Sequence, residues 1–592
     1  MRFTSFLLGA ALVAASLLLA QAPASATHGA LSGKVTDLFG TALNQVCVTI
    51  GPPVRCVTMT KVDGTWFVDL AGAPDGLTWD VRFLIGGVIK KEFLAVVVNG
   101  PTIVNAQIDT GSAPPPPPVP VCTAARADNP TATNYLPNVT KTLGGPTGFQ
   151  TPFIVQNTGT ATASLEVSWY KFADGSCAKR ISIDRAPGTS YAYVPNNDAS
   201  LPDNTQFSVV VRSYGSTAVS VVNEHQGVGD RAEALSYDGF SGGATRVFLP
   251  NVTRRFCAGC RAGSGGFVTP FVIQNLGSGS TTATAQFQER GGSGSLSIIR
   301  VIEPGRSQFV DPNSTLGLVD GKAYAVTVTA DQPVAVVVNT HDDASTVAQP
   351  IAYSTDGIAE GAATLYAPYA AKNTDGVGRV SSIVVQNVGT LPASPTLKFT
   401  ALGGGTPTSF SLGNVESSKA AAFDPRYTNG DTNMALCGTG ASTGCLADGE
   451  YTVEISAAGG SLAAAVSVLS TATAMGYSAI TKAGAKYFLP NVTRTLGGAT
   501  GWTTPIMLQS ATATSAALSW YRFSDGVLVT TQTVPLSAGS GTRIDPRTVP
   551  GTTDDTQYAV VVQASGGNVA AIVVEMASGG DNAMIYEGFA VP

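Results

Sequence analysis

The sequence predicts an all-β protein made of tandem β-sandwich domains, and three observations lead to this fold class. Only 12% of the residues are charged, against about 25% in ordinary soluble domains, while Gly, Thr, Ser and Val are abundant. Short runs of β-forming residues alternate with Gly, Pro, Asn and Asp at intervals typical of sandwiches. Finally, a segment of roughly 115 residues occurs four times, so repeated domains fill most of the 592 residues.

The chain begins with the pattern of a secretory signal peptide. Arg2 precedes an apolar run over residues 6–20, and the small residues Ala24-Ser25-Ala26 follow. This predicts a signal peptide over residues 1–26 with cleavage after Ala26, and hence export to the cell surface or the extracellular medium. No later run is long enough to span a membrane, so we expect no transmembrane segment after signal cleavage.

Residues 27–108 form the first predicted domain. Gly33-Lys34-Val35-Thr36-Asp37 opens it, Asp63-Gly64 marks a hairpin turn before Thr65-Trp66-Phe67, and a hydrophobic run over residues 93–98 closes it. This order resembles the carboxypeptidase regulatory-like family. The resemblance implies a small transthyretin-like β-sandwich, a fold also described as carbohydrate-binding-like. It implies no activity, because such modules are accessory parts in most of the proteins that carry them.

Residues 109–130 form a predicted proline-rich linker. Five consecutive prolines at 114–118 and a sixth at 120 favour an extended polyproline helix. We expect a stiff spacer between the first domain and the repeats.

Each repeat opens with a Leu-Pro-Asn signature, followed by a strand that ends in Gln-Asn or a variant of it. The first copy has Leu136-Pro137-Asn138 and Gln156-Asn157, and the third is degenerate at Tyr366-Ala367-Pro368. A strand with one large aromatic residue and a closing strand with a tyrosine complete the unit. We place repeat 1 at 131–246, repeat 2 at 247–363, repeat 3 at 364–485 and repeat 4 at 486–592. The aromatic residues are Trp169, Phe287, Phe399 and Trp520, and the closing tyrosines are Tyr237, Tyr353, Tyr477 and Tyr586.

The repeats look like the tandem immunoglobulin-like modules of bacterial surface and secreted proteins. About ten residues separate each closing tyrosine from the next entry strand. Such connections are too short to be free linkers, so we expect neighbouring repeats to touch end to end. The sequence therefore predicts an elongated monomer with four sandwiches in line.

Eight cysteines in an exported chain predict disulfides. Local spacing favours four pairs. For Cys257 and Cys260 the alternative is a redox-active Cys-x-x-Cys motif. It is disfavoured because the motif lies in a Gly-rich loop and not before a helix. The predicted pairs are Cys47 with Cys56, Cys122 with Cys177, Cys257 with Cys260, and Cys437 with Cys445.

The sequence offers little for catalysis. There are three histidines, and His225 and His341 occupy equivalent places in two repeats. In an array of modules in line such residues lie about one module apart, so we expect them to share neither a metal nor a proton. No nucleophile elbow, zinc helix or nucleotide-binding loop occurs. We therefore expect no catalytic residue, no metal ligand and no cofactor, and the net charge of -6 without a basic patch excludes nucleic acid as a partner.

Four aromatic residues are candidates for ligand binding. Tyr170 and Phe172 in repeat 1 match Tyr521 and Phe523 in repeat 4, each pair beside a cation. Period-two alternation puts them on the strand face opposite to the tryptophan. There they either stack on a sugar ring or pack against a neighbouring module or sheet edge.

These observations favour a secreted or cell-surface, non-enzymatic protein with a structural, adhesion or display role. The alternative is a carbohydrate-binding protein that uses the first domain or the aromatic residues of repeats 1 and 4. Candidate partners are surface polysaccharides and other surface proteins.

Overall fold

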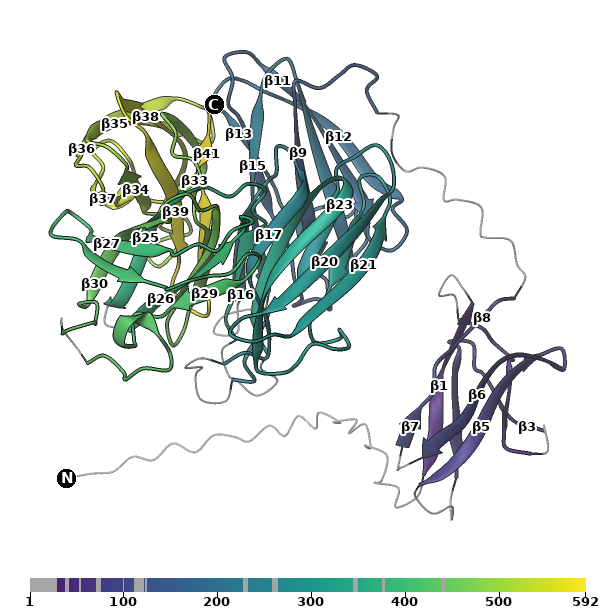
Figure 1. Ribbon diagram of the computed structural model, residues 1–592. Coiled ribbons are helices and arrows are strands. Elements are labelled where there is room, and N and C mark those ends of the chain that lie inside the picture. The colour runs from purple at the N-terminus through teal and green to yellow at the C-terminus, as the bar shows by residue number, and fades with distance from the viewer. Residues whose placement is uncertain are drawn as a thin grey trace, which may run out of the picture. The chain divides into compact units, whose positions relative to one another are not determined.

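Tandem β-sandwiches make up the described chain, as the composition and turn spacing predict (Figure 1). The computed structural model describes residues 29–37, 42–52, 55–70, 76–98, 101–110, 122, 125–226, 233–257, 264–343, 350–374, 378–438 and 442–591. The chain divides into two compact units, Met1–Val119 and Pro120–Pro592. The predicted signal peptide and the proline run lie outside the described residues. Within the described part, no helix has the length and apolar character needed to cross a membrane.

The first unit is a sandwich of two four-stranded sheets. One sheet has the order β4-β1-β7, with β8 also paired to β1, and the other has the order β3-β2-β5-β6. Trp66 and Phe83 meet edge to face in the core between them, with ring centroids 5.6 Å apart. The strands are β1 (Ala30–Asp37), β2 (Cys47–Ile50), β3 (Cys56–Met59), β4 (Thr65–Asp69), β5 (Leu77–Ile85), β6 (Val88–Val98), β7 (Pro101–Ile103) and β8 (Ala106–Ile108).

Repeat 1 sets the plan of the second unit. Its outer sheet has the order β12-β11-β14-β9, and its inner sheet has the order β13-β10-β15-β16. Trp169 is fully buried between them. The strands are β9 (Ala132–Lys141), β10 (Phe153–Asn157), β11 (Ala163–Lys171), β12 (Cys177–Arg185), β13 (Ser190–Tyr193), β14 (Thr205–Tyr214), β15 (Ala218–Gln226) and β16 (Glu233–Asp238).

Repeats 2 to 4 keep this strand order with local differences. In repeat 2 one long strand, β23, replaces two strands and runs through both sheets. In repeat 3 the entry strand β25 also pairs with β26 and joins the two sheets, and in repeat 4 β41 adds a strand to the outer sheet. The strands of repeat 2 are β17 (Ala244–Arg254), β18 (Phe267–Val268), β19 (Phe271–Asn275), β20 (Thr281–Glu289), β21 (Ser295–Ile302), β22 (Ser307–Val310), β23 (Lys322–Asp342) and β24 (Ala352–Asp356). Those of repeat 3 are β25 (Thr364–Thr374), β26 (Arg379–Asn387), β27 (Thr396–Ala401), β28 (Thr408–Ser411), β29 (Ala420–Phe423), β30 (Gly449–Ser456), β31 (Leu462–Leu469) and β32 (Ala474–Ser478). Those of repeat 4 are β33 (Lys486–Arg494), β34 (Ile506–Ser510), β35 (Thr514–Arg522), β36 (Leu528–Leu536), β37 (Gly541–Ile544), β38 (Thr556–Ser565), β39 (Val569–Met576), β40 (Ala583–Glu587) and β41 (Phe589–Ala590).

The four repeats close into a ring. The entry strand of each repeat packs against the inner sheet of the next: β9 against β19 and β23, β17 against β26 and β31, β25 against β34 and β39, and β33 against β10 and β15. Figure 1 shows the yellow strands of repeat 4 beside the blue strands of repeat 1. Such head-to-tail contacts form a ring when the last copy meets the first. The predicted in-line array, and the elongated monomer that rested on it, are therefore wrong for residues 120–592.

The closing strands β16, β24, β32 and β40 line the centre of the ring, each in contact with two others. In repeat 1 the hydroxyl group of Tyr237 donates to the carbonyl oxygen of Asn138 (2.7 Å) and so ties the closing strand to the entry strand. Tyr477 and Tyr586 repeat this bond. In repeat 2 the strand register places Thr355 at this position, so the prediction of Tyr353 as the equivalent residue is wrong by two residues.

The described residues contain three disulfides. They join Cys47 to Cys56, Cys122 to Cys177, and Cys437 to Cys445. The second ties the end of the linker to repeat 1, and a hydrogen bond from the Arg126 amide to Glu166 (3.0 Å) adds to that attachment. The predicted partner of Cys257, Cys260, lies outside the described residues.

Candidate functional site

Buried glutamates join neighbouring repeats at two of the four seams of the ring. At the seam between repeats 1 and 2, Glu224 accepts hydrogen bonds from the side-chain amides of Asn138 (2.9 Å) and Asn339 (3.2 Å). Asn138 belongs to the Leu-Pro-Asn signature of repeat 1, and Asn339 belongs to repeat 2. Glu224 thus gives the asparagine of the entry-strand signature in repeat 1 a buried partner.

The seam between repeats 4 and 1 repeats this arrangement. Glu575 accepts from Asn491 of its own signature (2.7 Å) and from Asn223 of repeat 1 (2.8 Å). Desolvation raises the pKa of Glu575 to about 8 and the pKa of Glu224 to about 7. Glu575 therefore keeps its proton at pH 7, whereas Glu224 titrates near pH 7.

Each of these seams also holds a histidine against an aromatic ring, but the two histidines differ. His341 lies 5.6 Å from the Phe149 ring and 3.8 Å from the carboxylate of Glu233. Burial lowers the pKa of His341, but the hydrogen bond and charge of Glu233 outweigh it, and the net shift is upward. His225 lies 5.5 Å from the Trp502 ring, and burial lowers its pKa to about 4.

Three carboxyl groups converge at one end of the closing strands. Asp238, Asp356 and Glu587 each offer an oxygen atom, and these atoms lie within 4.8 Å of one another. They occupy equivalent positions in repeats 1, 2 and 4, and Ser478 takes the place in repeat 3. The expectation that equivalent residues lie one module apart is therefore wrong at this point, because the ring brings strand ends together.

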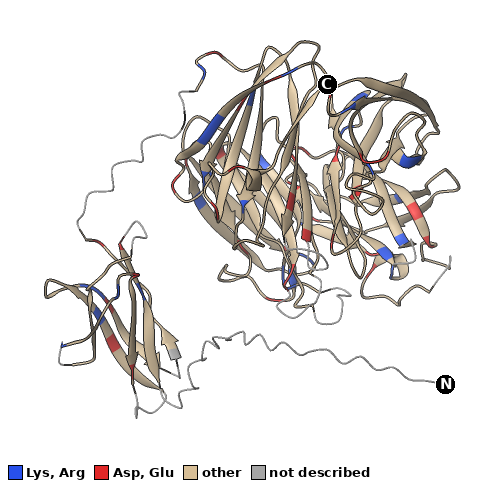
Figure 2. Cartoon of the chain, turned by 180° about the vertical axis from the view of Figure 1, so that it is seen from behind, with Lys and Arg blue, Asp and Glu red and all other residues tan. Residues whose placement is uncertain are grey.

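Asp238, Asp356 and Glu587 are here called the axial cluster, and their surroundings determine their charge state. No Lys or Arg of the described chain forms an ion pair with Asp238, Asp356 or Glu587, and Figure 2 shows that charged residues are sparse on the sandwiches. Burial raises the pKa of Glu587 to about 7, and burial with mutual repulsion raises the pKa values of the two aspartates well above their ordinary range. Protonation of these acids relieves the repulsion.

The opposite end of the closing strands holds a fourth acid. Asp581 is fully buried, and its carboxylate accepts hydrogen bonds from the backbone amides of Ala352 in repeat 2 (2.6 Å) and Ala474 in repeat 3 (2.7 Å). A side chain of repeat 4 thus holds the first residues of two other closing strands.

The acidic turns that precede the densest strands have a structural role. Asp203 lies 3.1 Å from Lys141 at the end of the entry strand, and Asp554 lies 2.8 Å from Arg494 at the equivalent place. Asp320 with Arg254 and Asp448 with Lys372 repeat the pair. A cation of the chain itself therefore faces each of these carboxylates.

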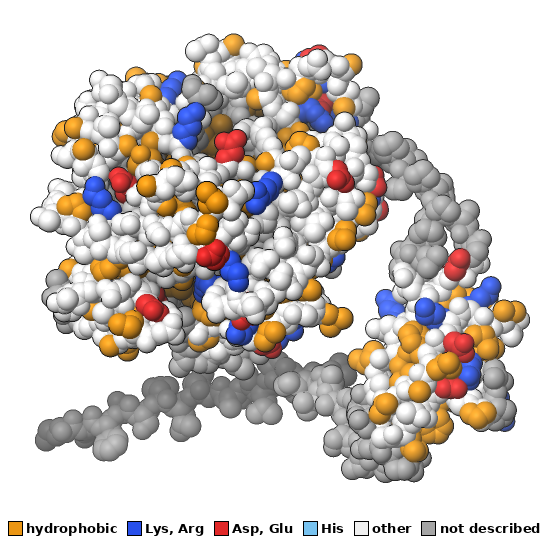
Figure 3. Space-filling model, viewed as in Figure 1, with side chains coloured by type: hydrophobic (Ala, Val, Ile, Leu, Met, Phe, Trp, Pro, Cys, Tyr) orange, Lys and Arg blue, Asp and Glu red, His pale blue; other side chains and the backbone are white. Residues whose placement is uncertain are grey.

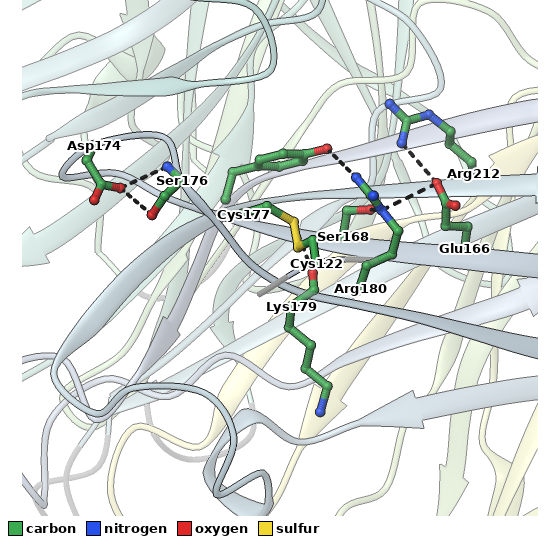
Figure 4. Close-up of a disulfide and its surroundings, with 10 residues drawn as sticks. Cys122, Glu166, Ser168, Asp174, Ser176, Cys177, Lys179, Arg180 and Arg212 are labelled. Carbon is green, nitrogen blue, oxygen red and sulfur yellow. Dashed lines mark hydrogen bonds and ion pairs between the residues drawn. A yellow bond between two sulfur atoms is a disulfide. The ribbon is translucent and has the colours of Figure 1, made fainter. Parts of the chain in front are cut away.

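The four candidate aromatic residues are all partly buried. The Tyr170 hydroxyl accepts a hydrogen bond from Arg180 (3.3 Å), and Figure 4 shows Arg180 close to Ser168 and Glu166. Phe172 packs against the core of repeat 1 and Phe523 against the core of repeat 4. Tyr521 lies near Gly188 of repeat 1. The two pairs therefore lie in separate repeats. Tyr170, Phe172 and Phe523 each contact residues of their own repeat.

Exposed apolar side chains are frequent on the first unit. Val88, Ile89, Leu94 and Val97 are exposed along β6, and Phe67 on β4 is 58% exposed. Figure 3 shows hydrophobic side chains gathered on the visible face of this unit. Sequence reasoning missed this surface because each of these residues belongs to a strand whose burial cannot be read from one sequence.

No family model and no curated protein matches the chain. The chain is weakly similar to several solved structures, of which three follow. Thermotoga maritima 1070 is 18% identical over 19% of this chain and 93% of that chain, with a TM-score of 0.16. BcpA, the major pilin subunit of Bacillus cereus, is 11% identical over 56% and 95%, with a TM-score of 0.14. A tetra-tandem repeat from the extending region of a large adhesion protein is 11% identical over 74% and 94%, with a TM-score of 0.09.

Proposed function

We propose that this chain is an exported, non-enzymatic scaffold with a structural, adhesion or display role at a cell surface. One observation carries the proposal: several buried acids that the ring brings together hold neighbouring repeats in place. Glu224 and Glu575 each bind two asparagines, and Asp581 binds two strand ends. A closed ring of this kind provides a fixed base, and the first unit supplies a second, separate module with exposed apolar side chains.

Export is part of this proposal. The signal-peptide pattern of residues 1–26 supports it, and so do three disulfides, which persist in oxidising compartments.

The mature chain, prepared from residue 27 onward, tests the role. We expect saturable binding to cell envelopes or to an immobilised surface polymer, with the bound material recovered chemically unchanged when analysed by mass spectrometry. Release of modified fragments in proportion to protein concentration would contradict a scaffold role.

Carbohydrate binding is the second candidate, and the exposed Phe67 favours the first unit as its location. A flat aromatic ring on a sheet surface is suited to stack on a sugar ring. Phe67 lies beside Ser32 of β1, which in turn pairs with Ile103 of β7. A glycan array of the mature chain and its Phe67→Ala variant tests this: sugar binding that the substitution leaves unchanged would exclude this site.

A further inference from the structure

A cavity of about 150 Å³ lies in the seam between repeat 4 and repeat 1. Phe153 and Ile154 of repeat 1 and Trp502 and Met584 of repeat 4 supply apolar walls. Ala192 lines the cavity and is itself exposed, so it lies at the mouth. An apolar cavity of about this volume holds a molecule the size of benzene.

The polar groups of the cavity are neutral near pH 7. Glu575 is bonded to two asparagines and retains its proton, and His225 is an uncharged imidazole at that pH. No Lys or Arg is among the cavity-lining residues. The site therefore offers no charge to attract an ion and little polar surface to replace the hydration of a sugar.

In the described chain, the histidine at the seam between repeats 4 and 1 lacks the acidic partner that its equivalent has between repeats 1 and 2. Between repeats 1 and 2, the carboxylate of Glu233 approaches the His341 ring. The equivalent position in repeat 4 is Asn582, whose amide turns away and donates to Ser578 (3.4 Å) and to Gly579. Among the described residues, no group forms a hydrogen bond with the His225 ring. A half-buried imidazole with an unbonded nitrogen beside a cavity is a ready partner for a ligand hydroxyl.

We propose that this cavity, here called the seam cavity, binds a neutral aromatic molecule of about the size of phenol, with its hydroxyl group bonded to His225 and its ring against Trp502. The function is additional to the scaffold role. Because residues of the first and the last repeat both line the seam cavity, a bound molecule contacts the two ends of the ring and stabilises the closed form.

Fluorescence titration and thermal shift of the mature chain test the proposal, with phenol, benzene and glucose as probes. We expect phenol to bind saturably, to change the fluorescence of Trp502 and to raise the melting temperature. Benzene binds more weakly because it lacks the hydroxyl group, and glucose does not bind.

Two variants and a control locate the site. His225→Phe keeps a ring but removes the nitrogen, so it weakens phenol binding roughly five- to tenfold and leaves benzene binding unchanged. Ala192→Trp fills the mouth and abolishes binding of both probes. Ala161→Trp, at an exposed alanine of the same repeat that does not line the cavity, leaves both unchanged. No saturable binding of phenol, equal phenol binding by Ala192→Trp, or tighter binding of glucose than of phenol would overturn the proposal.

Discussion

The side-chain amide of Asn223 donates a hydrogen bond of 2.8 Å to the carboxyl group of Glu575, although 352 residues separate them in the chain. Asn223 lies on the inner sheet of repeat 1, and Glu575 lies on the inner sheet of repeat 4. No peptide segment runs directly between these two repeats, so noncovalent contacts hold this seam closed.

Asn223→Ala removes one of the two donors to Glu575. A buried acceptor that loses its donor costs about 1–3 kcal/mol of stability. We expect a loss of that size in urea unfolding of the mature chain. Asn197→Ala, at an exposed position of repeat 1, is the control and stays within about 0.5 kcal/mol. Equal, small effects of both substitutions would mean that the bond does not support the seam.

Glu575→Gln tests the protonation of the seam. The pKa of Glu575 is about 8 in the folded chain against an ordinary value of 4.5, so the folded state binds the extra proton between these values. Stability therefore decreases as the pH rises from 5 to 8, on the order of a few kcal/mol for this group. The glutamine variant cannot ionise, so it should lose this pH dependence. Its amide nitrogen cannot accept a hydrogen bond, so one of the two asparagine donors loses its partner and the variant should be less stable than the parent at pH 5. A variant with the parent's pH profile in calorimetry would refute the shift.

Ile154→Ala tests whether repeat 4 covers the face of β10 that points away from the core of repeat 1. Ile154 is 8% exposed and packs into the core of repeat 4. Truncation of a buried isoleucine costs about 2–5 kcal/mol. Ile299→Ala is the matched control, because Ile299 is 60% exposed, and its cost stays near zero. If Ile154→Ala were as mild as its control, the seam between repeats 1 and 4 would not be packed in solution.

Phe523→Ala separates packing from ligand stacking at this candidate aromatic site. Because Phe523 packs against the core of repeat 4, we expect a loss of about 2–4 kcal/mol and a lower melting temperature. Binding to any sugar that the chain recognises stays unchanged at temperatures where the variant is folded. An unchanged melting temperature together with lost sugar binding would restore Phe523 as a ligand contact.

The sandwich fold could be predicted because strands and turns leave local signals. The Asp63-Gly64 turn, the Leu-Pro-Asn signature and the single large aromatic residue of each repeat all depend on nearby residues. The asparagine of the Gln-Asn strand is one example. The side-chain amide of Asn157 donates hydrogen bonds to the carbonyl oxygens of Ala161 (2.8 Å) and Arg185 (2.9 Å) in its own repeat. Such contacts occur within one module whatever the arrangement of the modules.

The ring could not be predicted from short connections, because a short loop is compatible with rotation about an axis as well as with extension along a line. One signal did point to it. The strand Phe153–Asn157 has apolar residues on both faces before its Gln-Asn end. The run Val219-Ser220-Val221-Val222 is also apolar on both faces, with Ser220 as the one polar residue. A sheet with one face in solvent alternates apolar and polar residues, whereas a sheet covered on both faces does not. Ile154 and Val221 are the residues that repeat 4 covers.

The axial acids were missed for the same reason. Asp238, Asp356 and Glu587 stand at strand ends, where single carboxylates are common, and only the ring places them together. The seam glutamates Glu224 and Glu575 lie in valine-rich strands and are buried. In the sequence, their position within such a strand was the sign that these two acids are buried.

A designed disulfide between repeats 1 and 4 tests the closed ring most directly. A Cβ atom built at Gly526 in repeat 4 lies 3.7 Å from the Cβ of Thr189 in repeat 1, which is within the range of disulfides. The variant Thr189→Cys with Gly526→Cys should form this bond in the oxidised monomer, as a crosslinked peptide in mass spectrometry after digestion without reductant. Thr189→Cys with Gly175→Cys is the control: Gly175 occupies the equivalent turn of repeat 1 but faces Arg306 of repeat 2, so no bond forms. The ring predicts a crosslink in the first variant alone, and its absence there, with both new thiols free to react, would contradict the closed arrangement.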